Sequence, residues 1–335
     1  FMYMDAKDGA FRPAPLPAAV ALVDAAAGGS PSLLLPYLPD AWILSRLAAA
    51  IAAVDAHLKA YEIAAAVTAV YEFWYKELCD VYLESIKPVM QREASTPALA
   101  AARHATQSVL HCCLHNGLRL LHPFMPFVTE ELYQRLQLLT GEARTSIMLA
   151  PYPTPEPCAI WRSAAAEGAM AEIAKFAEAI RAMRARYLKG ALEKHAPVIY
   201  ISCRDAKAAA LIDAQRETIN VLARSSKSPP VAELHLTKKE EVPRGCATDV
   251  LDASTEVHIY LKGVVDFGGE IKRLQKERGL VAGRLDKLVK KTEAKDYATK
   301  CPAATQEEDR TKVAEMNGEI ASLDAAIAAF EAGAD

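Results

Sequence analysis

Features of membrane, secreted and metal-stabilised proteins are scarce in this sequence. Its seven cysteines are odd in number, scattered and never spaced Cys-x-x-Cys, so they indicate neither a disulfide framework nor a zinc knuckle. No apolar run reaches the roughly 18 to 20 residues of a membrane span, and residues 1–20 carry no charged-then-apolar signal pattern. We therefore expect a soluble protein with reduced thiols, in the cytoplasm or in an organelle, without a membrane partner.

The sequence is also poor in aromatic residues and in net charge. Aromatic residues make up 7% of the 335 residues, whereas alanine, which has the best helix propensity, is abundant. This composition favours a mainly α-helical protein. The formal net charge of −3 excludes a protein that is basic all over, so nucleic-acid binding would require a local basic patch.

Apolar periodicity predicts a bundle of four amphipathic helices in the first half of the chain. The first helix begins at Asp40, which we take as its N-cap, and the second stops at Lys87-Pro88, because a residue before proline disfavours the helical region. The third and fourth each open close to a proline, which costs no hydrogen bond in a first turn. The predicted helices are Asp40 to Tyr61, Ile63 to Ile86, Pro97 to Leu121, and one that starts near Pro126.

Changes in composition divide the chain into four predicted segments. Residues 1–39 are rich in proline, glycine and alanine, which denies them a long helix and suggests a loop or insertion. Prolines at 151, 153, 155 and 157 mark a boundary after the bundle. The predicted segments are a loop at 1–39, a helical domain at 40–140, a small α/β subdomain at 141–265, and a coiled-coil arm at 266–335.

The small α/β subdomain is predicted from one helical and three strand patterns. Ala164 to Lys189 has helical periodicity, and β-branched and aromatic residues alternate with polar ones in the three strand segments. The predicted strands are Val198–Ser202, Val231–Leu236 and Val257–Leu261.

The last segment contains the clearest periodicity, two heptad series joined by a short polar stretch around Cys301-Pro302. Steps of three and four residues predict an antiparallel coiled-coil hairpin, in which Gly279 and Gly283 weaken the first arm and mark a bend. The inward positions are predicted at Ile271, Leu274, Arg278, Val281, Leu285 and Leu288, and at Val313, Met316, Ile320, Leu323, Ile327 and Phe330.

The two arms of this hairpin differ in charge. The first is mainly basic, from Lys272 to Lys291, and the second is weighted acidic by residues such as Glu307 and Glu319. Composition leaves two interpretations open. Opposite charges could attract across the arms, or the basic arm could contact the backbone of RNA.

Several motifs resemble valyl-tRNA synthetases, which are class I aminoacyl-tRNA synthetases. The segment from His122 to Leu132 resembles the helix junction of their anticodon-binding domain, where its two prolines should bracket a packed aromatic corner. Phe73 to Glu84 resembles the second helix of that domain, and Ser146 to Pro153 its strand-like exit. Pro39 to Leu47 and Ile180 to Tyr187 continue the match, which covers residues 40–335 in order and ends in a terminal coiled coil.

The resemblance implies a fold and a set of partners. It implies a helical anticodon-binding bundle, a small α/β subdomain and a tRNA-binding coiled-coil arm, with tRNA(Val) as the partner, contacts to other translation proteins and no DNA. Arginine and lysine suit contacts to RNA backbone and to unstacked bases. The candidate tRNA-binding residues are Arg46, Lys76, Arg181, Arg184, Arg273, Lys276, Arg284 and Lys287.

The sequence departs from a complete synthetase in its chemistry. No His-x-Gly-His motif occurs, and Arg224-Ser225-Ser226-Lys227-Ser228 only superficially resembles the ATP-binding loop of class I enzymes, because it follows the bundle. We interpret it as a surface loop. His111 and His115 could share a metal at helical spacing, but no third ligand is in view. We therefore expect no catalytic residue, metal or cofactor here, with ATP and magnesium bound elsewhere in a parent enzyme.

Two alternatives remain open from the sequence. A free-standing RNA-binding protein derived from a synthetase would lack aminoacylation, and a scaffold would use the coiled coil to bind another protein. Leu188-Lys189-Gly190 also departs from the turn that usually follows the arginine-rich helix of the family, which leaves the start of the small subdomain unsettled.

Overall fold

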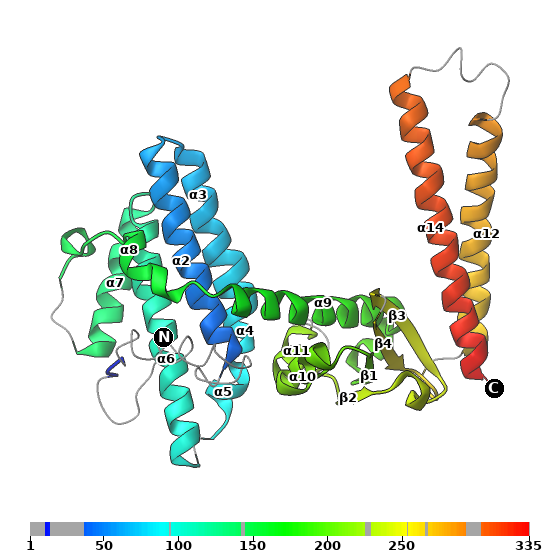
Figure 1. The fold of residues 1–335 in the computed structure, drawn as a ribbon, viewed down its shortest axis with the longest axis horizontal. Coiled ribbons are helices and arrows are strands. Elements are labelled where there is room, and N and C mark those ends of the chain that lie inside the picture. The colour runs from blue at the N-terminus through cyan, green and yellow to red at the C-terminus, as the bar shows by residue number, and fades with distance from the viewer. Residues whose placement is uncertain are drawn as a thin grey trace. The chain divides into compact units, whose positions relative to one another are not determined.

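The computed structural model describes residues 11–13, 37–93, 95–141, 145–224, 229–252, 254–264, 267–292 and 303–334. Most of the loop predicted at 1–39, the loop at 225–228 and the hairpin connection around Cys301-Pro302 lie outside these residues. The chain forms two compact units, Phe1–Ala174 and Lys175–Asp335 (Figure 1). The division between the units falls within the helix Ala164–Tyr187 and coincides with none of the predicted segment boundaries. The predicted segment bounds of 40–140, 141–265 and 266–335 therefore stay predictions.

The first unit is a helical bundle, as the sequence predicted. Helix α2 lies against α3, η1 and α6, and α6 lies against α7 (Figure 1). The elements are α2 (Leu38–Lys59), α3 (Ile63–Tyr71), η1 (Glu72–Tyr82), α4 (Leu83–Ser85), α5 (Lys87–Gln91), α6 (Pro97–Leu121), α7 (Pro126–Thr140), η2 (Ile147–Leu149), α8 (Pro155–Cys158), η3 (Ala159–Trp161) and the start of α9 (Ala164–Tyr187).

Helix boundaries in this bundle follow proline closely. Pro97 and Pro126 open α6 and α7, and the Thr96 hydroxyl caps α6 by accepting from the Leu99 N–H. Lys87-Pro88 does not end the helical path, because α5 adds one further turn. The strand-like exit expected at Ser146 to Pro153 is also wrong: Ile147–Leu149 forms a 3-10 turn.

Asp40 is not the N-cap that the sequence suggested. Helix α2 starts earlier, at Leu38, and Asp40 lies fully buried in its first turn. Its two carboxylate oxygens accept from the Tyr82 hydroxyl at 2.7 Å and from the Thr106 hydroxyl at 2.8 Å. Burial raises the pKa of Asp40 to about 6, although both hydrogen bonds oppose that rise. The carboxyl group therefore joins three helices in the centre of the bundle.

One helix of the bundle is long and apolar enough to cross a membrane by length and composition. This helix is α2, with a mean hydropathy of 1.4 over an 18-residue window, half of which is buried inside the unit. Its apolar face, including Ile43, Leu47 and Ile51, is fully enclosed by the other helices. Such burial is what the central helix of a bundle requires, so we assign its apolarity to the core.

The second unit contains a mixed sheet of four strands in the order β2-β1-β4-β3. β1 pairs in parallel with β2 and antiparallel with β4, and β4 pairs antiparallel with β3. The strands are β1 (Val198–Cys203), β2 (Glu233–Thr237), β3 (Cys246–Asp252) and β4 (Thr255–Tyr260). The turn η4 (Gly190–Lys194) precedes β1, and α10 (Ala206–Ala214), α11 (Arg216–Leu222) and η5 (Lys239–Glu241) lie between strands. The predicted strands 198–202, 231–236 and 257–261 correspond to β1, β2 and β4, whereas β3 was missed.

The two faces of this sheet differ in chemistry. Strand register places Leu234, Ile199, Ile259 and Ala247 in one row, and all four side chains are buried. The opposite face carries the row His235, Tyr200, His258 and Thr248. The apolar face therefore belongs to the core of the subdomain, and the predicted class of a helical domain with a small α/β subdomain is confirmed.

The chain ends in two long helices, α12 (Phe267–Thr292) and α14 (Ala303–Ala334), that lie side by side (Figure 1). Arg278 pairs with Asp324 and Lys291 pairs with Asp309. A higher residue number in α12 thus pairs with a lower one in α14, so the two helices run antiparallel. Leu274, Val281 and Ile327 are buried, as the heptad pattern predicted, whereas Arg278, also predicted to face inward, is exposed. Helix α12 continues through Gly279 and Gly283 without a break, and the expected bend there stays a prediction.

Candidate nucleic-acid interface

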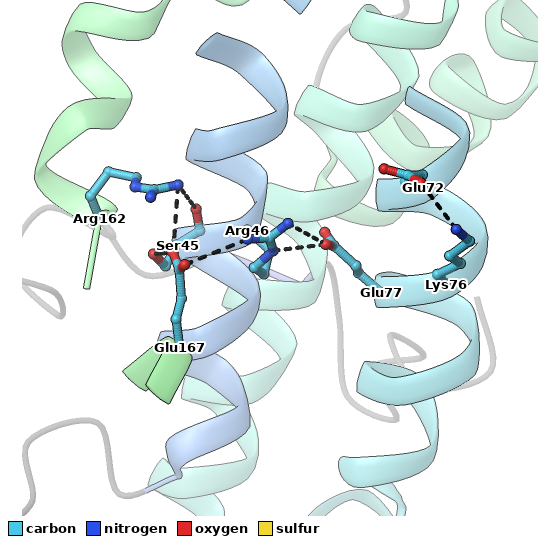
Figure 2. A network of polar contacts seen from close by, with 7 residues as sticks. All are labelled: Ser45, Arg46, Glu72, Lys76, Glu77, Arg162 and Glu167. Atoms are coloured by element: carbon cyan, nitrogen blue, oxygen red, sulfur yellow. Dashed lines mark hydrogen bonds and ion pairs between the residues drawn. The ribbon is translucent and has the colours of Figure 1, made fainter. Parts of the chain in front are cut away.

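Arg46 lies in an ion network that joins three elements of the first unit (Figure 2). Its guanidinium contacts a Glu77 carboxylate oxygen at 2.7 Å and a Glu167 oxygen at 3.5 Å. Burial lowers the pKa of Arg46, but the two carboxylates outweigh it and raise that pKa overall. Glu167 also accepts from Ser45 and stands in the first turn of α9, where the helix dipole favours a negative charge. The geometry gives Arg46 a structural role in α2, η1 and α9.

Lys76 lies on the exposed side of η1, beside a ridge of aromatic and aliphatic residues. Its ammonium pairs with Glu72 at 3.0 Å, one turn away, in a contact open to solvent (Figure 2). Tyr71 and Tyr75 stack their rings 5.3 Å apart, and each is about half exposed at 53% and 54%. The aromatic ridge, as we name it, comprises Tyr61, Ile63, Val67, Tyr71 and Tyr75.

The backbone beneath the ridge has two unusual features. Glu72–Tyr82 is a π-helix, a rare conformation whose hydrogen bonds run to the fifth residue and which is frequent at functional sites. Tyr61 has a positive φ of 60° and an exposed side chain at 88%. The sequence analysis named Lys76 beside this ridge but did not single out Tyr61 or Tyr71, because helical spacing cannot show which apolar face is left uncovered.

Trp74, in contrast, belongs to the packing of the bundle. Its indole N–H donates to the Gly117 carbonyl at 3.2 Å, and its ring covers the Cα of that glycine. A Cβ at position 117 would stand 2.9 Å from the ring. Gly117 is therefore needed for the close approach of the ring to α6.

The two arginines proposed on α9 lie in different surroundings. Arg181 is exposed. Arg184 is only 5% exposed, donates to the Pro229 carbonyl at 2.8 Å, and its Nε and one Nη have no partner among the described residues. Burial lowers the pKa of Arg184. The burial of Arg184 gives it a contact inside the second unit, and of the two arginines only Arg181 presents an exposed side chain.

Four basic residues form an exposed stripe along α12, away from its partner helix. At 3.6 residues per turn, Lys272, Lys276 and Lys287 lie about 120° to 180° around the helix from the buried Leu274 and Val281. We name this set, with Arg284 on its flank, the basic stripe. In the described part of the chain none of the four makes an ion pair, so attraction between the arms does not explain them.

The other cations of the hairpin neutralise carboxylates of their own helix or of α14. Arg273 pairs with Glu277 at 3.1 Å, and Arg278 and Lys291 pair across to Asp324 and Asp309. Attraction between the two helices therefore accounts for Arg278 and Lys291, whereas RNA contact by the outward-facing residues stays a prediction. Of the predicted candidates on α12, Arg273 is engaged within the helix, whereas Lys276, Arg284 and Lys287 face outward.

The histidine pair of α6 is part of an aromatic ladder. His111 and His115 stack with centroids 5.8 Å apart, and His115 Nε2 lies 3.0 Å from the Tyr133 hydroxyl. Burial lowers the pKa of both histidines to about 4. Phe11 packs on the same row, against His111 and His104. No cluster of three potential metal ligands was found among the described residues.

The fold of the first unit and these surfaces define a class of protein. Residues 40–199 match the family described as the anticodon-binding domain of tRNA ligase. This part of the chain therefore belongs to that family. Comparison with individual proteins narrows the family to ligases for one amino acid.

The chain is homologous to valine–tRNA ligases over most of its length. It is 37% identical to that of Rattus norvegicus over 294 residues, which is 88% of this chain and 22% of the relative. It is 36% identical to that of Homo sapiens over 304 residues, 91% of this chain and 22% of the relative. A mitochondrial valine–tRNA ligase of Mus musculus is 31% identical over 288 residues, 86% of this chain and 25% of the relative. The chain thus spans about a quarter or less of the length of these relatives.

Proposed function

We propose that this chain recognises tRNA(Val) as the C-terminal part of a valine–tRNA ligase. The observation that carries the proposal is the continuous similarity to valine–tRNA ligases, which runs through both compact units. In that enzyme the chain would select and position the tRNA. ATP-dependent attachment of valine, with magnesium, would take place in the remaining three quarters of the protein. We propose a cytoplasmic location, which is supported by the higher identity to relatives named simply valine–tRNA ligase than to the mitochondrial one.

The aromatic ridge supplies suitable chemistry for the anticodon. Bases in a single-stranded loop can unstack and lie against aromatic rings, a contact worth about 1–3 kcal/mol per base. Tyr71 and Tyr75 already form a two-ring stack that is open to solvent, and Lys76 supplies a positive charge beside it. We therefore place anticodon contact on this ridge rather than on Arg46.

The basic stripe supplies the second contact. Lys272, Lys276, Arg284 and Lys287 are exposed along one helix of the second unit. Lysine and arginine in such a row suit the phosphate backbone and the overall shape of folded RNA, without reading its sequence. The ridge would then contribute specificity, and the stripe would contribute affinity.

Direct binding measurements with anticodon variants test this division. The double variant Tyr71→Ala and Tyr75→Ala should weaken binding of tRNA(Val) about tenfold or more, because two stacking faces are lost. The matched control, Tyr71→Phe with Tyr75→Phe, keeps both rings and should bind within about twofold of the natural chain. Equal binding by the alanine and phenylalanine variants would remove the ridge from the interface. Equal binding of cognate and anticodon-changed tRNA by the natural chain would contradict tRNA(Val) recognition itself.

A further inference from the structure

The junction of α6 and α7 exposes large apolar side chains that the bundle does not use. The sequence predicted a packed aromatic corner at this junction, and Phe124 does pack against the core. Phe127, however, is 90% exposed and Met125 is 50% exposed, so the prediction is wrong for these residues. Two more come from η2, where Met148 and Leu149 are 73% and 80% exposed.

Polar contacts hold these two elements together at one corner of the first unit. His122 lies 2.7 Å from the Thr129 hydroxyl through Nδ1 and 2.8 Å from the Met148 sulfur through Nε2. A Glu130 carboxylate oxygen accepts from the Ser146 hydroxyl at 2.9 Å and from the Ile147 N–H at 3.0 Å. The apolar corner, which we define as Met125, Phe127, Val128, Met148 and Leu149, is therefore built on a fixed backbone.

The chemistry of the apolar corner fits a protein surface better than a nucleic acid. Exposed apolar patches mark interaction sites, and a surface that is already ordered loses less entropy on binding. Among the described residues from 122 to 150, the one arginine, Arg135, pairs with Glu131, and no lysine occurs. Glu130 adds a negative charge, so among these described residues the corner offers a polyanion no unpaired lysine or arginine.

We propose that the apolar corner docks against an apolar protein surface contributed by the remainder of the synthetase polypeptide. This inference rests on the proposed function, and its support is the length of the relatives, of which this chain matches only 22% to 25%. The unmatched remainder of such a protein is about three to three and a half times as long as the matched part, so it would supply the surface in the same molecule. An intramolecular partner also needs no additional subunit, because the linkage itself gives a high effective concentration.

Hydrogen exchange tests the docking without relying on tRNA. Amides in the segments 122–130 and 146–150 should exchange at least tenfold more slowly in the full-length synthetase than in this chain alone. Phe127→Ser with Leu149→Ser should abolish that added protection. The matched control Leu138→Ser, at an exposed position of 49% near the other end of α7, should leave it intact.

Three outcomes would overturn the docking. Identical exchange in both proteins would show that nothing in the synthetase covers the corner. Loss of tRNA affinity in the Phe127→Ser, Leu149→Ser chain would assign the corner to RNA. Concentration-dependent dimers of the natural chain that this double variant abolishes would assign it to a second copy. A failure of tRNA(Val) binding alone would contradict the proposed function and leave the exchange comparison unaffected.

Discussion

Asp40 shows how one buried residue can make the stability of the fold depend on pH. Its pKa is raised from 3.8 to about 6, mainly by burial. A raised pKa means that the neutral form fits the folded state better, so its stabilising effect is present below about pH 4 and is lost as the pH rises through 6. At 1.36 kcal/mol per unit, the loss is on the order of 3 kcal/mol.

The variant Asp40→Asn should remove this component. The difference in unfolding free energy between the natural chain and the variant, measured by urea denaturation, should change by about 2–3 kcal/mol between pH 4 and pH 7. The comparison must be a difference, because His111 and His115, with pKa values lowered to about 4, lose stability in the opposite direction as the pH falls. Tyr82→Phe removes a hydrogen bond that lowers the pKa of Asp40, so it should shift the window to higher pH. A constant difference across the range would contradict this assignment.

At the scale of elements, the sequence predicted helices better than strands. Pro97 and Pro126 located two helix starts correctly, since proline is tolerated in a first turn. Strand β3 was missed because Ala247 and Asp249 lack the β-branched pattern, and its pairing with β4 depends on distant residues. The π-helix was missed because no spacing rule distinguishes it from an α-helix. The exposure of Phe127 and the burial of Arg184 could not be predicted, because they depend on which helix face the rest of the fold covers.

Glycine has opposite roles in α6 and α12. A Cβ at Gly279 or Gly283 meets nothing within 4 Å, whereas one at Gly117 meets Trp74 at 2.9 Å. Gly279→Ala and Gly283→Ala should therefore each stabilise the hairpin by about 0.5–1 kcal/mol through helix propensity. Gly117→Ala should destabilise the bundle by about 1–3 kcal/mol through overpacking. The midpoint temperature of thermal unfolding, measured for the three variants, shows whether each substitution stabilises or destabilises the chain. A destabilising effect of Gly279→Ala would show that α12 packs against another group at that position.

At the scale of the whole molecule, the candidate interface divides between the two units. The ridge in the first unit offers stacking surfaces with one lysine, and the stripe in the second offers charge. Part of this was predictable, because Lys276, Arg284 and Lys287 were named from the basic character of their helix together with the family resemblance, and all three are exposed. Arg46 and Arg184 were chosen in the same way and are committed to internal contacts, which only the packed structure reveals.

The salt dependence of tRNA(Val) binding tests the central claim most directly. The logarithm of the binding constant falls with the logarithm of salt concentration by about 0.7–0.9 per neutralised phosphate. Changing Lys276, Arg284 and Lys287 to glutamate should reduce that slope by about two to three and weaken binding at low salt by at least tenfold. The matched control changes Arg135, Lys194 and Lys207, which are exposed and lie off α12, to glutamate and should keep the slope of the natural chain. Equal slopes for the two triple variants would contradict an RNA-binding role for the basic stripe.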